Sequence, residues 1–495
     1  MLNDTIVVNL VTDTAQAAGG GSIALFSVIN SSIQGSALAR EETKSLLCRS
    51  RFGCLCAPKY LLTFFGFLMS KPRSSIFVDF SLLKNNSNFR SVFIARLISV
   101  LSLGMLTVAV PVQIHALTGS ALHVGLAVAL DGVGMFVGLM CGGVLADRYD
   151  RRKLILMARC LCGIGFLVLA LNSFIAAPSL LALYLVAVWD GFFGALGITA
   201  LMASIPALVG RENLSAAGAL SMLTVRLGAI LSPAIAGVVI ASAGVSWNYL
   251  LAGLGTLCTL IPLLCLPSMQ PAVGKPEHPL RALADGVHFL MQSPVVGAVV
   301  VMGTLQTMLS AIRVMFPVLA VSVYGGGAFE VGLMYSAVPL GAMTGAFTSG
   351  WVARVQRPGL LLIAAVISAA LVIVVFGLIS HLPSGLVALV IFGYLGSISS
   401  LLQFTLVQQH TPDRLLGRVN SLWSAQDVVG DSVGALGLGA LARAFAPLLA
   451  VCSFAGSVAL AGAMLGLGFS GLRRLQNPPP ETEPLLPEVA SEAAH

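Results

Sequence analysis

From Phe89 to Gly471 the chain consists almost entirely of apolar stretches, separated by short polar turns. The stretches are roughly 20 to 28 residues long, and a helix needs about 20 apolar residues to cross a hydrocarbon layer about 30 Å thick. Strands of a membrane barrel would be about half as long and would alternate in polarity. The hydrophobic fraction is 57%, above the roughly 45–50% of soluble domains. The sequence therefore predicts an all-α protein that crosses a membrane many times.

The apolar stretches number about twelve, and the longest polar connection divides them into two sets of about six. The predicted organisation is an N-terminal half at 69–267, a linker at 268–293, a C-terminal half at 294–471 and a tail at 472–495. The predicted spans are 89–113, 120–145, 153–175, 179–208, 214–242, 247–267, 294–320, 328–352, 358–380, 383–409, 418–443 and 447–471.

Lys and Arg are concentrated in alternate turns. The turns DRYDRRK, GREN, ARVQRPG and TPDRLLGR carry them, as do the linker and the tail segment LRRLQN. The turns HALTGSALH, NSFIAAPS, SAGVSW, SVYGGGAF and SHLPSG carry none. Because basic turns stay on the cytoplasmic side of a membrane, we expect both termini in the cytoplasm. The net charge of +7 is thus an orientation signal, and nucleic acid is not an expected partner.

Two segments outside the predicted spans flank or join the halves. Residues 1–68 lack the layout of a signal peptide, and their composition indicates no stable domain. We expect translation to begin at Met69. The linker starts with a proline-rich segment and continues as PLRALADGVHFLM, whose periodicity predicts an amphipathic helix at the membrane surface.

The two halves repeat in sequence. The segment 124–148 aligns without gaps on 331–355, and 218–237 aligns more weakly on 420–439. Two halves that repeat in parallel are the architecture of major facilitator transporters. The glycines that coincide in the stronger alignment are Gly125, Gly134, Gly138 and Gly143 with Gly332, Gly341, Gly345 and Gly350.

The turn GGVLADRYDRRKLIL at 142–156 resembles the signature that major facilitator transporters carry between spans two and three. In the predicted arrangement Gly143 allows close helix contact, and Asp147 faces the positive N-terminus of a helix from the other half, span eleven. Such contacts would latch the halves together in one conformation. The alternative is a plain positive-inside anchor. Two positions depart from the pattern, Asp150 in place of glycine and Arg354 in place of the acid in the second copy. The predicted latch residues are Gly143, Asp147, Arg148, Arg151 and Arg152.

Eight charged residues lie in the interiors of the predicted spans, more than five residues from either end, and an ionisable residue at mid-bilayer costs about 2.5–3.5 kcal/mol on insertion scales. A structural ion pair is the alternative explanation for some of them, and Arg96 and Arg159 lie near span ends, where they can extend to the surface. Asp427 and Asp431, four residues apart, share a helical face and predict a proton site. Arg226 and Arg313 could meet an anionic substrate or hold Asp190. The predicted substrate and proton residues are Asp131, Asp190, Arg226, Arg313, Asp427 and Asp431.

Enzymatic and metal-dependent functions find no support in the motifs. The chain has no GxxxxGK[ST] phosphate loop. Its seven histidines are scattered, and its cysteines lack metal-ligand spacing. We expect neither catalysis, cofactor nor metal.

From Met69 to about Asn477 the chain resembles the enterobactin exporters of the major facilitator superfamily. The likeness rests on stretches such as FSLLK, GGVLADRY, WDGFF, PALVGRENL, MLTVRLG and LGRVNSLW. It implies a protein of the bacterial inner membrane that exports the siderophore enterobactin from cytoplasm to periplasm. It also implies proton coupling and handover to a periplasmic or outer-membrane efflux system. A drug or macrolide exporter, a transporter-like sensor without flux, and uptake remain open as alternatives.

Overall fold

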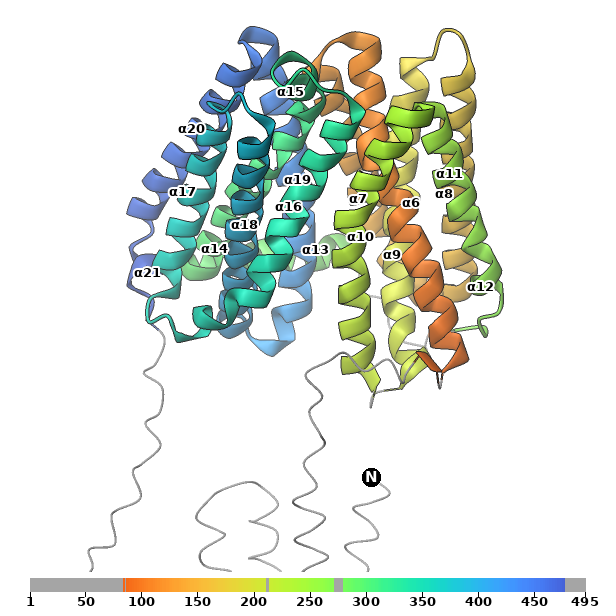
Figure 1. Ribbon diagram of the computed structural model, residues 1–495. Coiled ribbons are helices and arrows are strands. Elements are labelled where there is room, and N and C mark those ends of the chain that lie inside the picture. The colour runs from red at the N-terminus through yellow and green to blue at the C-terminus, as the bar shows by residue number, and fades with distance from the viewer. Residues whose placement is uncertain (1–82, 85, 211–212, 271–278, 477–495) are drawn as a thin grey trace, which may run out of the picture. The chain divides into compact units, whose positions relative to one another are not determined.

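The computed structural model describes residues 83–476 except 85, 211–212 and 271–278. The described residues form helices joined by short turns (Figure 1). Eleven of these helices are long and apolar enough to cross a membrane. The predictions that concern residues 1–68, including a start at Met69, lie outside the described residues.

The N-terminal half begins at Ser87 and ends at Leu264, and its helices alternate in direction (Figure 1). The sixth predicted span, which is the last of this half, is divided between two almost continuous helices, α11 and α12. The helices are α6 (Ser87–Thr118), α7 (Ala121–Arg148), α8 (Arg151–Phe174), α9 (Leu180–Val209), α10 (Leu214–Ala243), α11 (Val245–Cys258) and α12 (Leu260–Leu264).

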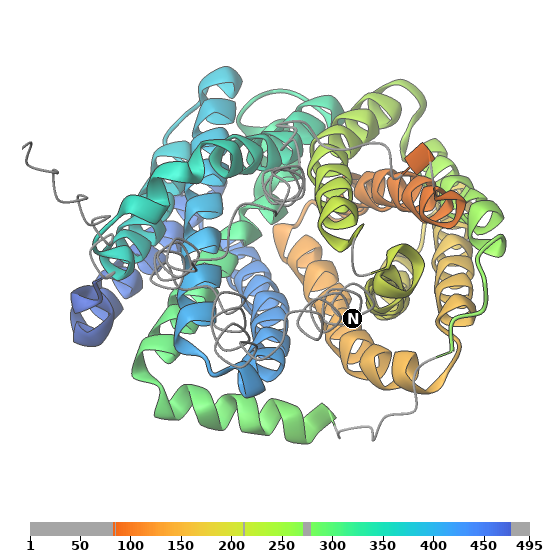
Figure 2. The same ribbon diagram turned by 90° about the horizontal axis from the view of Figure 1, so that it is seen from below.

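The C-terminal half follows α13 (Pro279–Gln292), which lies across the ends of the other helices rather than parallel to them (Figure 2). It contacts α19 and α14. The remaining elements are α14 (Pro294–Ser310), η2 (Ala311–Met315), α15 (Phe316–Ser322), α16 (Ala328–Thr348), η3 (Ser349–Arg354), α17 (Pro358–Phe376), α18 (Leu382–His410), α19 (Asp413–Ala444), α20 (Pro447–Gly468) and α21 (Ser470–Arg474).

Helix α19 corresponds to the predicted span 418–443. It is not among the eleven helices that are apolar enough to cross a membrane. It is 32 residues long, enough to cross a bilayer, but it carries Asp427, Asp431 and several other polar residues. It packs against α7 of the other half and against α14. Helix contacts therefore take the place of lipid contacts over much of its surface. With α19, the candidate spans correspond one for one to the predicted stretches.

The predicted span 294–320 is interrupted. The α-helix ends at Ser310, continues as 3₁₀-helix η2 and resumes at Phe316. Pro317 has no N–H group, so it cannot donate to the carbonyl of Arg313 four residues earlier. The hydroxyl of Tyr335 on α16 donates to that carbonyl instead, over 3.1 Å. The break thus has a local cause, and it lies at a charged residue.

The sequence repeat corresponds to equivalent packing in the two halves. Gly134 lies against the backbone of Val188 on α9, and its counterpart Gly341 lies against the backbone of Val390 on α18. Neither site has room for a Cβ. Small residues at such contacts let membrane helices approach closely. The predicted repeat is therefore structural and not only compositional.

Glycines also make the contacts between the halves. Gly125 on α7 lies against the backbone of Ala435 on α19. On the other side, Gly237 on α10 lies against Gly332 on α16, with an added Cβ only 3.0 Å from the Gly332 Cα. Helices α7 with α19, and α10 with α16, therefore form two seams between the halves.

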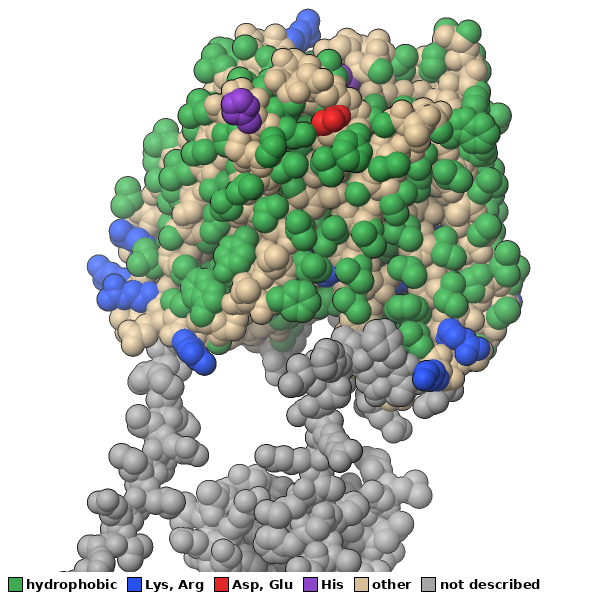
Figure 3. Space-filling view, in the orientation of Figure 1, with side chains coloured by type: hydrophobic (Ala, Val, Ile, Leu, Met, Phe, Trp, Pro, Cys, Tyr) green, Lys and Arg blue, Asp and Glu red, His purple; other side chains and the backbone are tan. Residues whose placement is uncertain are grey.

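Basic side chains gather toward the end of the molecule that holds the α7–α8 turn and α21, the lower end in Figure 3. This agrees with the alternation of charged turns. One exception is Arg443, which lies in the last turn of α19, a position outside the predicted basic set.

Candidate functional site

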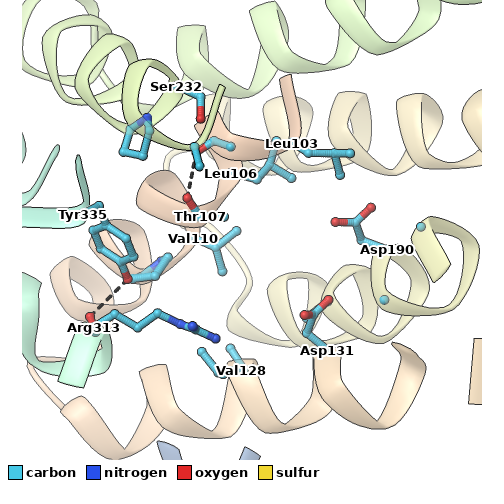
Figure 4. Close-up of a pocket in the computed structure, with 18 of the residues that line it drawn as sticks. Leu103, Leu106, Thr107, Val110, Val128, Asp131, Asp190, Ser232, Arg313 and Tyr335 are labelled. Carbon is cyan, nitrogen blue, oxygen red and sulfur yellow. Dashed lines mark hydrogen bonds between the residues drawn. The ribbon is translucent and has the colours of Figure 1, made fainter. Parts of the chain in front are cut away.

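A cavity of about 650 Å³ lies between the two halves. Helices α6, α7, α9 and α10 line it from one half, and η2, α16 and α18 from the other. Its lining is mainly apolar, and three of the lining residues are charged, namely Asp131, Asp190 and Arg313 (Figure 4). A volume of this order suits a drug-sized ligand. The uncharged polar side chains in the lining are Thr107, Ser232, Ser310 and Tyr335.

Arg313 enters the cavity from the helix break at η2. Its guanidinium Nη2 pairs with Oδ2 of Asp431 on α19. The same turn is held by Tyr335, whose ring packs edge-on against Phe316 at a centroid distance of 5.0 Å. The helix break, the tyrosine contact and the ion pair together fix the position of this cation in the cavity wall.

Asp131 extends from α7 toward the same space as Arg313 (Figure 4). Its backbone carbonyl lies against Gly191 on α9, which leaves no room for a Cβ there. In the aligned repeat Asp131 corresponds to Val338, which also lines the cavity. The first half therefore has a carboxylate at a position where the second half has an apolar side chain, and both positions face the cavity between the halves.

Asp190 enters from α9, on the side of the N-terminal half (Figure 4). The preceding residue, Trp189, donates its indole N–H to the carbonyl of Leu161 over 2.9 Å. The indole also fits against Gly165, where an added Cβ would be 3.1 Å from the ring. These contacts fix α9 against α8. The Oδ1 atom of Asp190 is buried and has no hydrogen-bond partner among the described residues.

The other predicted intramembrane residues lie outside the cavity lining. Asp431 is paired with Arg313, whereas Asp427 is exposed. The structure thus assigns the two acids of the predicted proton site to different environments. Within the described residues Arg226 makes no ion pair, and it is not brought to Asp190 as the sequence suggested.

The predicted latch is not closed in this conformation. An added Cβ at Gly143 would meet no heavy atom within 4 Å, so the predicted close contact is absent there. The neighbouring Gly142 makes it instead, with an added Cβ 3.1 Å from Oγ1 of Thr199 on α9. Asp147 and Arg148 are exposed. The reason is that α7 meets α19 near Gly125 and Gly132, far from this turn.

The two arginines of the turn bind carbonyl groups within their own half. Arg151 Nη1 donates to the carbonyl of Ala203 on α9 over 2.7 Å. Arg152 Nη2 donates to the carbonyl of Leu264 at the end of α12. These hydrogen bonds hold the α7–α8 turn against the N-terminal half, and neither of them is made to α19.

Asp150, the departure from the family pattern, has a clear structural role. It caps α8 by accepting from the N–H of Arg152 over 2.9 Å. The same carboxylate accepts from the Ser268 hydroxyl over 2.6 Å and from the Met269 N–H over 3.0 Å. Burial raises the pKa of Asp150, but these hydrogen bonds outweigh it and hold the pKa below its ordinary value. The start of the linker is thus docked on the α7–α8 turn.

Sequence reasoning missed Arg159 on α8. It was expected to extend to the membrane surface, but its side chain is 6% exposed, and Nη1 has no partner among the described residues. Its guanidinium lies 3.9 Å from the position of a Cβ at Gly197. The sequence carries no signal for this burial, because it depends on how α8 is rotated against α9.

The described residues hold no cluster of three or more His, Cys, Asp or Glu that could bind a metal ion. The cysteines among them are free thiols.

Two repeated helical halves around a charged internal cavity define a membrane transporter. The chain belongs to the Major Facilitator Superfamily, whose family model matches residues 92–435. It is 51% identical over 408 residues to an enterobactin exporter, EntS, of Citrobacter koseri, which covers 82% of this chain and 98% of that protein. An enterobactin exporter of Escherichia coli O1:K1 is 51% identical over 409 residues, which cover 83% of this chain and 98% of the relative.

Solved transporters share the fold at low sequence identity. A POT family transporter in complex with 5-aminolevulinic acid superposes with a TM-score of 0.64 at 12% identity, over 78% of this chain and 97% of that one. The nucleoside transporter NupG gives a TM-score of 0.63 at 12% identity, over 78% and 99% of the two chains. The predicted fold class is confirmed, and the chain is a multi-pass membrane transporter rather than an enzyme.

Proposed function

We propose that this protein exports enterobactin from the cytoplasm to the periplasm across the bacterial inner membrane. The observation that carries the proposal is the 51% identity to enterobactin exporters over 98% of their length. The cavity supports it, because a bulky aromatic ligand needs a largely apolar space with a few polar groups.

The conformation fits a cycle of alternating access. The seams α7–α19 and α10–α16 close the cavity on the side away from the α7–α8 turn. If basic turns face the cytoplasm, with both termini on that side, the seams are periplasmic and the cavity loads from the cytoplasm. The latch at Gly143, Asp147 and Arg148 would then form when the cytoplasmic side closes. Arg151 and Arg152 would hold the turn in place throughout.

Proton influx would drive export. Asp131 and Asp190 are the cavity carboxylates, and each can carry a proton. Arg313 pairs with Asp431 and extends toward Asp131 in the cavity (Figure 4), so it is the cation best placed to respond when Asp131 is neutralised. Asp427 and Arg226 remain secondary candidates. At roughly 150 mV one proton supplies about 3.5 kcal/mol, enough for a few-hundred-fold gradient of substrate.

Broad export of drugs or macrolides is the second candidate function. The mainly apolar lining of the cavity favours it, because apolar surface discriminates weakly between ligands. In either case the protein contacts inner-membrane lipid, and a periplasmic or outer-membrane efflux system would receive the product.

The test is export from iron-starved Gram-negative cells that lack their own catecholate exporter. The full chain is expressed, and chromatography of the medium separates intact enterobactin from its linear fragments. We expect intact enterobactin to reappear, to be lost in Asp190→Asn, and to persist in the control Thr344→Val at equal membrane levels. Fragments alone, with good expression, would overturn the proposal. Resistance to unrelated drugs would then favour the second candidate.

A further inference from the structure

Prolines interrupt three of the helices that line the cavity. Pro111 in α6, Pro233 in α10 and Pro339 in α16 lie inside their helices and also in the cavity lining. A proline has no N–H group, so the carbonyl four residues earlier loses its helical donor. The residues that carry these carbonyls line the cavity as well, and they are Thr107, Ala229 and Tyr335.

The freed carbonyls lie on the cavity side of their helices. Residues four apart share a helical face, and in each case both the proline and the residue four positions before it line the cavity. Backbone that lacks its helical hydrogen bond is tolerated at membrane depth where it is buried in protein or lines a water-filled space. These carbonyl oxygens are therefore hydrogen-bond acceptors on the surface that a ligand in the cavity meets.

The same cavity wall shows which donor such a carbonyl takes. Pro317 frees the carbonyl of Arg313 in the same way, and the phenolic hydroxyl of Tyr335 donates to that carbonyl over 3.1 Å. This is a hydrogen bond between a phenol and a carbonyl freed by a proline. The protein thus contains one example of the contact that a phenolic ligand would make with the other freed carbonyls.

An unpartnered hydroxyl lies at the same wall. Ser232, next to Pro233, is 1% exposed and belongs to the cavity lining, and its Oγ has no hydrogen-bond partner among the described residues. It fits against Gly104 on α6, where a Cβ would collide with it. Ser232 and Thr107 lie across the cavity from Asp190 (Figure 4). The contact of α6 with α10 is therefore a polar site whose hydrogen bonds are incomplete without a ligand or water.

We propose that the carbonyls of Thr107, Ala229 and Tyr335 form an acceptor wall that binds the phenolic hydroxyls of the substrate. The ligand class is a neutral molecule with several aromatic hydroxyl groups, to which the catechol rings of enterobactin belong. Arg313, the cation in the described lining, is already paired with Asp431, so the wall selects hydrogen-bond donors rather than anions. The inference rests on the proposed function for the identity of the substrate, but the preference for hydroxyl donors is measured separately.

The test compares two probes on the purified full-length protein, a tris-catechol amide with free hydroxyls and the same molecule with every hydroxyl O-methylated. Replacing a proline by alanine restores the N–H group that occupies the carbonyl. Pro111→Ala, Pro233→Ala and Pro339→Ala should each weaken binding of the free catechol by about threefold to tenfold, the value of one hydrogen bond, and change binding of the methylated probe by less than about twofold. Pro383→Ala is the matched control, because Pro383 lies in the first turn of α18, where an N–H group has no helical acceptor.

Equal weakening of both probes in the proline variants would overturn the inference, because a change of helix shape alone affects both ligands alike. Unchanged binding of the free catechol, or the same loss in Pro383→Ala, would also overturn it. Thermal unfolding identifies any variant that does not fold, and each of the three prolines is an independent test.

The two proposals fail in different ways. If the purified protein discriminates between the probes as expected but cells export no enterobactin, the proposed function alone is refuted. If cells export enterobactin and the proline variants bind both probes as the wild type does, only the acceptor wall is refuted.

Discussion

Arg313 and Asp431 are 118 residues apart in the chain and form an ion pair at the wall of the cavity. The pair joins the helix break at η2 to α19, the most polar of the long helices. Its side chains are 38% and 21% exposed, so it is neither a surface pair nor a fully desolvated one. This intermediate exposure determines how far the loss of the ion pair should lower the free energy of unfolding.

Breaking this pair should destabilise the protein moderately. Arg313→Met or Asp431→Asn alone should lower the free energy of unfolding by about 1–3 kcal/mol, between the values for exposed and buried pairs. The double variant should lose less than the sum of the two. A double-mutant cycle of unfolding in mixed micelles measures the coupling, with Arg226→Met as the control. Additive losses would show that the pair contributes nothing.

The latch can be tested at Gly143. Because an added Cβ meets nothing there in this conformation, Gly143→Val should leave thermal stability within about 0.5 kcal/mol of the wild type. Transport should nevertheless fall at least about tenfold if the closed latch needs close helix contact. Gly218→Val is the control, since Gly218 also has open space around it. Equal transport in the two variants would remove Gly143 from the latch.

Asp150 should hold the start of the linker in a pH-dependent way. Its pKa is below the ordinary value, so its stabilising effect is complete above the unfolded-state pKa, near 3.8. The effect is lost as the pH falls through the lower folded-state value. At neutral pH, Asp150→Ala should speed amide hydrogen exchange at Met269 by about fivefold to tenfold, corresponding to about 1–1.4 kcal/mol.

Mass spectrometry of the exchanging peptide that contains Met269 provides this measurement. Asp147→Ala is the matched control, because Asp147 is exposed and lies on the same turn. Exchange that is equally fast in both variants would show that Asp150 does not anchor the linker.

One hydrogen bond crosses the α10–α16 seam. The hydroxyl of Ser336 donates to the carbonyl of Ile230 over 2.8 Å. Ser336→Ala should remove about 1 kcal/mol from this conformation and shift the conformational equilibrium about fivefold toward the other state. Distance measurements between spin labels on the two halves report the shift. Thr344→Val, which loses only a bond within α16 to Gly341, should leave the distances unchanged.

The sequence predicted the helices and the repeat well because both depend on local composition. Apolar length determines which segments can span a membrane, and the paired glycines occupy equivalent contacts at Gly134 and Gly341. The break at η2 has a local signal in Pro317, but the Tyr335 hydroxyl that satisfies the freed carbonyl of Arg313 comes from another helix and was not predictable.

The charged site was only partly predictable for the same reason. Asp131, Asp190 and Arg313 were found because any charge in an apolar span is conspicuous. Their grouping, the burial of Arg159 and the pairing of Asp431 depend on helix rotation, which one sequence does not define. Gly143 makes no close helix contact in this conformation, and its part in a latch stays a prediction for a conformation closed at this end.

The central claim is proton-driven export, and transport by the purified full-length protein in liposomes tests it most directly. The protein is inserted so that its cytoplasmic side faces the external medium, and the lumen of the liposomes is made more acidic than that medium. Uptake of enterobactin into the lumen is then measured. The account predicts accumulation that a protonophore abolishes and that Asp190→Asn prevents. Accumulation that is indifferent to the protonophore, or equal in Asp190→Asn, would contradict it.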